Sequence, residues 1–218
     1  MAAEHARGVL AALDGMSAAV REAERAMRVL RVGSIAPAPT WTLAPIFAQA
    51  FPGRDTEFRV METEESLLRA LDDGGIEAAV LLHVPPGPAW RGQMFLRERL
   101  GVMLPPVHPL ARRKTLRFAD LADETFVVFG SIGFWMPLVR SKIPNAEFLE
   151  QGTLAATRRI VANSDLPAFH TAVSADRMPV PEGRIVIPIR DPDAMAAYNF
   201  VVKSERADAF AAVFAALP

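Results

Sequence analysis

The apolar positions at the start of the chain recur at alternating spacings of four and three residues. They are Val9, Leu13, Met16, Val20, Ala23, Met27 and Leu30. A repeat of about 3.5 residues predicts one helix over residues 2 to about 27. The pattern leaves two interpretations open: a helix packed on its own domain, or a coiled-coil segment that pairs with a partner helix.

After this helix the pattern alternates between short apolar runs and amphipathic segments. We predict strands at 29–33, 56–62, 76–82, 101–105, 125–130, 184–190 and 199–203. We predict helices ending near residue 50 and at 65–73, 154–163, near 167–173 and at 206–217. Pro45 lacks an N–H and fits best in a first turn, so Thr40 and Thr42 are both candidate N-caps for the first of these helices. Strands alternating with helices predict an α/β fold with mainly parallel pairing.

Composition narrows the functional classes. About half of the 218 residues are apolar, and 24 basic residues balance 25 acidic ones, so no basic excess indicates nucleic-acid binding. The chain has no cysteine, which excludes thiol nucleophiles and thiolate metal sites. No window is long and apolar enough for a membrane helix, and the N-terminus does not resemble a secretory signal. We therefore expect a cytoplasmic protein that does not associate with membranes.

The candidate chemistry is sparse. His5, His83, His108 and His170 are isolated in sequence, so we expect no metal site and no cofactor. Ser131 lies in the string FGSIGF and is a candidate hydrolase nucleophile. That interpretation needs a base and an acid nearby, which the sequence does not show. Glycines that bring backbone amides toward a ligand explain the string better, and we expect no enzyme.

Three polar segments follow predicted apolar elements: SIAPAPT, FGSIGF and NSD at 163–165. In open α/β sheets, ligands collect at the carboxyl ends of strands and at helix N-termini. This placement favours a binding module over an enzyme.

The stretch RERLGVMLPPVHPLARRKTLRFADLADETFVVF (97–129) resembles the effector-binding domain of LysR-type transcriptional regulators. The family has a strand ending in proline, a His-Pro-Leu segment, a basic turn, and a short Asp-Leu-Ala-Asp helix before an aromatic-led strand. VLRVGS, FPGRDTEFRVME and IEAAVLL resemble the family's first three strands, and NFVVKSERADAFAAVFAAL resembles its returning strand and last helix.

The resemblance implies a two-lobed fold of the type 2 periplasmic-binding-protein kind, with a ligand cleft between the lobes. Residues 1–28 would be the linker and dimerisation helix, 29–112 the first part of lobe I, 113–190 lobe II, and 191–218 the return to lobe I. An effector, expected to be a small carboxylate or aromatic metabolite, would bind in the cleft and modulate transcription. The family assembles as homodimers or homotetramers and binds operator DNA through a winged helix-turn-helix.

The expected ligand-binding residues come from the three polar segments. They are Ser34, Ala36, Thr40, Phe129, Gly130, Ser131, Phe134, Asn163 and Ser164. Hydroxyls and free amides at helix starts suit a carboxylate, and the aromatic rings suit an apolar body. Each hydroxyl could equally serve only as a cap of its own helix, and each ring could be a core residue.

Two departures from the family pattern stand out. The winged helix-turn-helix is absent from this chain, for which we expect truncation rather than a gene encoding the domain alone. Around residues 162–170 the sequence reads ANSDLPAFH, where the family usually has Gly-x-Gly. Two alternative functions remain: a stand-alone or exported solute-binding protein of the same fold, and a serine hydrolase using Ser131.

Overall fold

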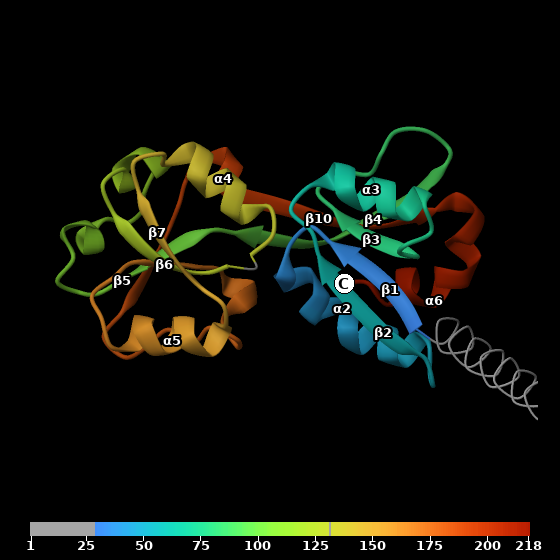
Figure 1. Cartoon of the computed structure of the whole chain (residues 1–218), viewed down its shortest axis with the longest axis horizontal. Coiled ribbons are helices and arrows are strands. Elements are labelled where there is room, and N and C mark those ends of the chain that lie inside the picture. The colour runs from blue at the N-terminus through green and yellow to red at the C-terminus, as the bar shows by residue number, and fades with distance from the viewer. Residues whose placement is uncertain (1–28, 131) are drawn as a thin grey trace, which may run out of the picture.

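The computed structural model describes residues 29–130 and 132–218. Its strands form two five-stranded sheets, with the orders β2-β1-β3-β10-β4 and β7-β6-β8-β5-β9. Each sheet carries its own helices, so the chain forms two lobes side by side (Figure 1). The predicted helix at residues 2–27 and Ser131 both lie outside the described residues.

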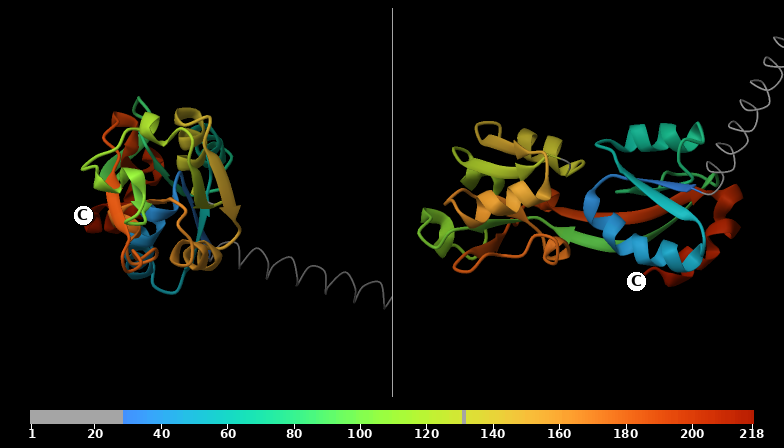
Figure 2. Two further views of the ribbon diagram at one scale, coloured as in Figure 1. Left: turned by 90° about the vertical axis from the view of Figure 1, so that its left-hand side faces the viewer. Right: turned by 60° about the horizontal axis from the view of Figure 1, so that its bottom comes forward.

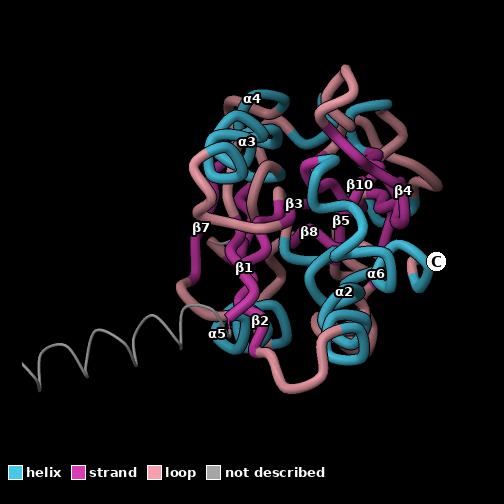
Figure 3. Tube along the Cα trace, turned by 90° about the vertical axis from the view of Figure 1, so that its right-hand side faces the viewer, coloured by secondary structure: helices cyan, strands magenta, loops and turns pink. Residues whose placement is uncertain are grey.

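Lobe I is the part of the chain around the first sheet. Its elements are β1 (Val29–Ser34), α2 (Pro37–Ala50), β2 (Asp55–Val60), α3 (Glu64–Asp72), β3 (Ala78–Leu81), β4 (Trp90–Arg99), β10 (Met195–Lys203), the 3-10 helix η5 (Ser204–Phe210) and α6 (Ala211–Ala216). Helix α3 covers one face of the sheet, while α2 and α6 lie together on the other (Figure 3). Phe47 of α2 is fully buried and packs against the rings of Phe51, Phe58, Phe200 and Phe210. This aromatic cluster fixes α2 on the sheet.

Lobe II is built around the second sheet. Its elements are β5 (Gly101–Leu104), the 3-10 helices η1 (Pro109–Arg112) and η2 (Phe118–Leu121), β6 (Thr125–Phe129), α4 (Trp135–Lys142), β7 (Glu147–Gln151), α5 (Leu154–Ala162), β8 (Ala168–His170), η3 (Ala172–Ser174), β9 (Ile185–Pro188) and η4 (Pro192–Ala194). Helices α4 and α5 lie on opposite sides of its sheet (Figure 1).

Two crossovers join the lobes. Strands β4 and β10 are long and pair antiparallel over their whole lengths (Figure 2). The chain leaves lobe I along β4 and returns to it along β10. The chain passes from β4 into β5 at Leu100, whose N–H donates to Ala194 O at 2.8 Å, while its C=O accepts from Ile189 N at 3.0 Å. These bonds tie the two crossovers together. Sheet membership thus places β5 in lobe II, although the predicted boundary at 112 assigned it to lobe I.

The α/β class is confirmed, and so is the two-lobed fold, but the prediction of mainly parallel pairing is wrong. Strand β1 runs parallel to β2 and β3, whereas β10 runs antiparallel to β3 and β4. In lobe II, β6 pairs parallel with β7 and β8, and β5 pairs antiparallel with β8 and β9. The antiparallel pairs in both sheets involve the strands next to the crossovers, β10 and β4 in lobe I and β5 in lobe II.

Two predicted helix positions also differ. Helix α2 begins at Pro37 with Ala36 as its N-cap, ahead of both predicted caps, and Pro45 lies in its interior. Pro37 favours this early start because a proline at the first helical position loses no hydrogen bond. The short helix predicted near 167–173 is instead strand β8 followed by the single turn η3. Its apolar residues fill the centre of the second sheet, so the sheet context overrides the local pattern.

Candidate functional site

A cavity lies between the two lobes, and residues of both line it. With its mouth it encloses about 750 Å³. Lobe I and the first crossover contribute Pro37, Ala38, Trp41, Glu98 and Leu100. Pro37, Ala38 and Trp41 lie in the first turns of α2. Because this helix begins shortly after β1 ends, the end of β1 places these three residues at the cavity.

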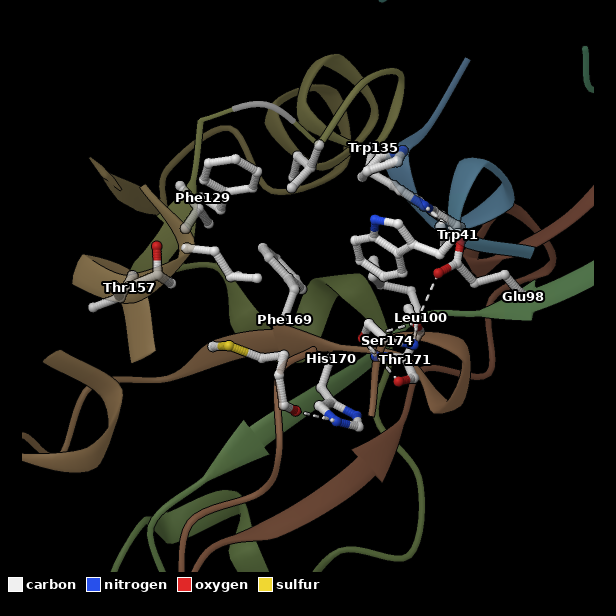
Figure 4. A pocket seen from close by; sticks show the side chains of 17 residues that line it. Trp41, Glu98, Leu100, Phe129, Trp135, Thr157, Phe169, His170, Thr171 and Ser174 are labelled. Atoms are coloured by element: carbon white, nitrogen blue, oxygen red, sulfur yellow. Dashed lines mark hydrogen bonds between the residues drawn. The ribbon is translucent and has the colours of Figure 1, made fainter. Parts of the chain in front are cut away.

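Lobe II supplies the larger part of the wall. Strand β6 contributes Val127, Val128 and Phe129, strand β8 contributes Phe169 and His170, and helix α5 contributes Leu154 and Thr157. Trp41 and Trp135 lie at one end of the cavity, Phe129 and Thr157 at the other, and the ring of Phe169 lies between them (Figure 4). The cavity is therefore mainly apolar and aromatic, which is the usual character of a small-molecule site.

One buried carboxyl group faces this apolar space. Glu98 of β4 is 3% exposed and lines the cavity. Its Oε2 accepts from Trp135 Nε1 at 3.1 Å and from the hydroxyl of Tyr198, and its Oε1 accepts from Thr171 Oγ1 at 2.7 Å. The three donors come from α4, β10 and the residue before η3, so Glu98 joins both crossovers to lobe II. A carboxyl group needs such partners to be buried at low cost.

The titratable neighbours of Glu98 are held in their neutral forms. Burial, reinforced by the nearby charge of Glu98, raises the pKa of the Tyr198 hydroxyl, which stays protonated and donates to Glu98. Burial lowers the pKa of His170, although a hydrogen bond between its Nε2 and Met178 O (3.1 Å) opposes the shift. A neutral His170 with Nε2–H as donor to the carbonyl satisfies both observations.

The two loops at the mouth touch each other. The N–H of Phe134, at the start of α4, donates to Ile35 O at 2.9 Å, so a backbone bond joins the lobes here. Gly133 precedes it with φ of +63°, and a Cβ at this position would overlap the Ile35 carbonyl group. Only glycine allows this approach without a shift of one of the loops. Arg177 lies over the ring of Trp41 at 5.8 Å and makes a second contact between the lobes.

The residues predicted from the first loop lie beside the cavity and do not line it. Ser34 is fully buried, and its Oγ donates to Ala36 O at 2.6 Å. Thr40 Oγ1 donates to Pro37 O at 2.6 Å within its own helix. Ala36 is buried as the N-cap of α2. Their neighbours Pro37, Ala38 and Trp41 line the cavity, while the hydroxyls of Ser34 and Thr40 bond to backbone carbonyls of their own segment.

The other predicted residues divide in the same way. Phe129 lines the cavity. The N–H of Gly130 donates to Gln151 O, and the ring of Phe134 packs at a tilt against that of Trp135 without lining the cavity. Asn163 donates to Arg159 O as the C-cap of α5, and Ser164 Oγ accepts from Leu166 N at 3.4 Å. Neither Asn163 nor Ser164 lines the cavity.

The predicted ligand-binding residues do not include Glu98, Trp135 or Thr171, which all line the cavity. No motif marks Glu98, since RERL is the sequence of an ordinary exposed strand. Within residues 29–130 and 132–218, no three His, Asp or Glu side chains gather to hold a metal ion.

The comparisons with known proteins decide the family. The model of the LysR substrate binding domain matches residues 23–217. The chain belongs to this family. A RuBisCO operon transcriptional regulator from Allochromatium vinosum is 37% identical over 87 residues, which are 39% of this chain and 28% of that protein. A small neutral protease regulatory protein from Streptomyces coelicolor (strain ATCC BAA-471 / A3(2) / M145) is 34% identical over 136 residues, covering 56% of this chain and 40% of the relative.

Solved structures confirm the fold of this LysR substrate-binding domain. The reduced regulatory domain of OxyR from Pseudomonas aeruginosa superposes with a TM-score of 0.63 at 18% identity, covering 85% of this chain and 94% of that one. The effector binding domain of BenM with its effector benzoate gives 0.56 at 22% identity, covering 80% and 83%. The matched segments span less than half of the curated relatives' lengths. In the part of the chain that is described, no helix is long and apolar enough to cross a membrane.

Proposed function

We propose that the cavity between the lobes binds a small effector molecule and that this LysR substrate-binding domain thereby senses it for a transcriptional regulator. The observation that supports the proposal is the origin of the cavity wall. Both lobes and the first crossover contribute side chains to one mainly apolar space. A ligand there contacts both lobes, so its affinity depends on how the lobes are arranged, which is the requirement for a ligand to shift that arrangement.

The wall favours a ligand with an aromatic or otherwise apolar body. Trp41, Phe129, Trp135 and Phe169 all face the cavity. Buried aromatic side chains provide large contact areas and favourable ring-to-ring geometries for a flat ligand. The effector is expected to carry a carboxylate or an aromatic group. The aromatic residues of the cavity lining support the aromatic group.

The remaining features of the regulator follow from family membership and belong to the proposal. We propose that the protein acts in the cytoplasm as a homodimer or homotetramer, with pairing supported by the heptad pattern of residues 9–30. Operator DNA would be bound through the winged helix-turn-helix of the full regulator. The nearly balanced charge of the chain agrees with a domain that does not itself bind DNA.

We further propose that the domain does not turn its ligand over. Among the described lining residues, the hydroxyl of Thr171 donates to Glu98, those of Thr157 and Ser174 donate to backbone carbonyls, and Nε2 of His170 is bonded to Met178 O. None of these hydroxyls is bonded to the imidazole of His170, so they form no hydroxyl–histidine pair for covalent catalysis. An exported solute-binding protein of the same fold remains the second candidate, since the fold supports both roles. Detection of the protein in a periplasmic fraction would favour it.

The binding proposal is testable with Nile red, an uncharged dye that fluoresces in apolar surroundings. Ala38 is 3% exposed and lines the cavity, so Ala38→Trp places an indole in the space. Ala48 lies on the exposed face of the same helix, and Ala48→Trp is the matched control. We expect dye fluorescence with the unmodified chain and with Ala48→Trp, and at least a tenfold weaker affinity with Ala38→Trp.

Equal dye binding by both variants would show that the site is elsewhere. Circular dichroism melts check that each variant is folded. Thr157→Phe, on α5 across the cavity, repeats the test from lobe II should Ala38→Trp not fold.

A further inference from the structure

The cavity lining has an unusual balance of charge for a site expected to bind a carboxylate. Its described lining residues include one carboxyl group, Glu98, and no lysine or arginine. His170 provides no positive charge, because burial lowers its pKa and its Nε2–H is used by Met178 O. A carboxylate ligand would enter an apolar space beside a buried carboxylate with no cation in the wall, which costs free energy twice.

Glu98 also has room for one more hydrogen bond. A carboxylate offers about four acceptor positions on its two oxygens. Oε2 already accepts from Trp135 Nε1 and from the Tyr198 hydroxyl. Among the described residues, Thr171 alone donates to Oε1, through its Oγ1. Because Glu98 lines the cavity, the free position of Oε1 is a place for a donor carried by a ligand.

We propose, on the basis of the function proposed above, that the effector is an uncharged or positively charged molecule with a mainly apolar body and at least one N–H or O–H group, which donates to Glu98. The aromatic rings of Trp41, Trp135 and Phe169 hold the body. They also favour a cation over an anion, since a ring face carries partial negative charge. The remaining acceptor position of Glu98 fixes the orientation of the polar end.

The positive charge of Arg177 is an argument against an uncharged or positively charged effector. Its guanidinium lies over the ring of Trp41, 5.8 Å from the ring centre, and it is not part of the lining. An anion at the mouth of the cavity could pair with it. The test therefore includes a variant of this residue.

The test compares three probes that share one ring system and differ in charge. They are 2-naphthalenemethanol, 2-naphthylmethylamine as a cation, and 2-naphthoate as an anion. Each is used to displace Nile red from the unmodified chain at pH 7.5. We expect the alcohol and the amine to displace the dye with affinities at least about tenfold tighter than that of naphthoate, because like charges in a shared apolar site repel.

Glu98→Gln identifies the group responsible. Glutamine keeps the shape and one acceptor oxygen while removing the charge, so the preference for the amine over naphthoate should fall at least about tenfold. Glu65→Gln removes the same charge from an exposed residue of α3 and should change nothing. The ranking of the three probes on the unmodified chain is decisive by itself if Glu98→Gln does not fold.

The outcomes separate this inference from the proposed function. If naphthoate binds as tightly as the alcohol and Ala38→Trp blocks it, the cavity is the site but the assigned ligand class is wrong. If Arg177→Gln abolishes that naphthoate binding, Arg177 is the polar anchor instead of Glu98, and the inference is overturned. If no probe displaces the dye, or if Ala38→Trp has no effect on displacement, the proposed site itself fails.

Discussion

Replacement of Gly133 by alanine tests whether the backbone contact between the lobes holds the cleft in its present arrangement. Gly133 has φ of +63°, in the left-handed region that costs an L-residue about 1–2 kcal/mol. A Cβ there would also lie 2.9 Å from Ile35 C and 3.0 Å from Ala36 Cα, closer than real Cβ contacts occur. One loop must therefore move, and the bond from Phe134 N to Ile35 O, now 2.9 Å, is the first to be lost.

Gly53 provides the matched control. It has φ of +81°, and a Cβ there would meet nothing within 4 Å. Gly53→Ala therefore has the same kind of backbone cost, and the same gain from a stiffer unfolded chain, without the clash. The difference between the unfolding free energies of the two variants therefore measures what the contact between the lobes contributes. The lost hydrogen bond contributes about 0.5–1.5 kcal/mol, and with the packing of the two loops we expect a difference of about 1–3 kcal/mol.

Two measurements check this expectation. Urea unfolding should show the larger loss of stability for Gly133→Ala, and amide hydrogen exchange should become faster at Phe134 in that variant alone. Equal unfolding free energies for the two variants, with an unchanged exchange rate at Phe134, would refute the reasoning. The loops would then touch without stabilising the present arrangement of the lobes.

Three further predictions address the core, the Glu98 cluster and pH. Phe47→Ala should lower the unfolding free energy by about 3–5 kcal/mol, measured by urea titration, because a fully buried ring at the centre of the lobe I cluster is removed. Tyr198→Phe should cost about 1.5–3 kcal/mol by the same assay, since it removes a donor to a buried carboxylate; a loss below 0.5 kcal/mol would contradict the assigned bond. Burial lowers the pKa of His170 from its ordinary 6.5, so the unfolded chain takes up that proton first on acidification. The stability contributed by neutral His170 is therefore complete above pH 6.5 and is lost as the pH falls toward the lowered pKa of the folded state. The urea midpoint should fall between pH 7.5 and pH 5, and it should fall less in His170→Gln.

The first loop shows how far the sequence could locate the site. The abrupt end of VLRVG before a proline-rich segment marks the edge of the sheet, and the structure places that edge at the cavity. The prediction rests on the ability of hydroxyls to bind ligands, yet Ser34 Oγ is bonded to Ala36 O and Thr40 Oγ1 to Pro37 O. Whether a hydroxyl serves its own backbone depends on local torsion angles, which residue types alone do not determine.

Glu98 shows why the polar anchor itself was beyond sequence reasoning. The register between β4 and β10 shifts between Tyr198 and Asn199, next to Phe95 on the opposite strand. Such an irregularity exchanges the inward and outward positions of a strand. Phe95 is buried before the shift and Glu98 and Leu100 are buried after it, so no single alternation describes β4. A prediction that assumes strict alternation of buried and exposed residues along β4 therefore cannot identify Glu98 as buried.

The position of Glu98 gives it a consequence for lobe movement as well as for binding. Its own strand and Tyr198 belong to the two crossovers, while Trp135 and Thr171 belong to lobe II. Any motion that separates lobe II from the crossovers must break the bonds to Trp135 and Thr171 and leave a carboxylate short of donors in an apolar space. A ligand that donates to Oε1 supplies a replacement for one of these partners. Under the proposed function, binding at Glu98 would therefore have a different free energy in the present arrangement and in one with lobe II separated from the crossovers, which is the property that a sensor requires.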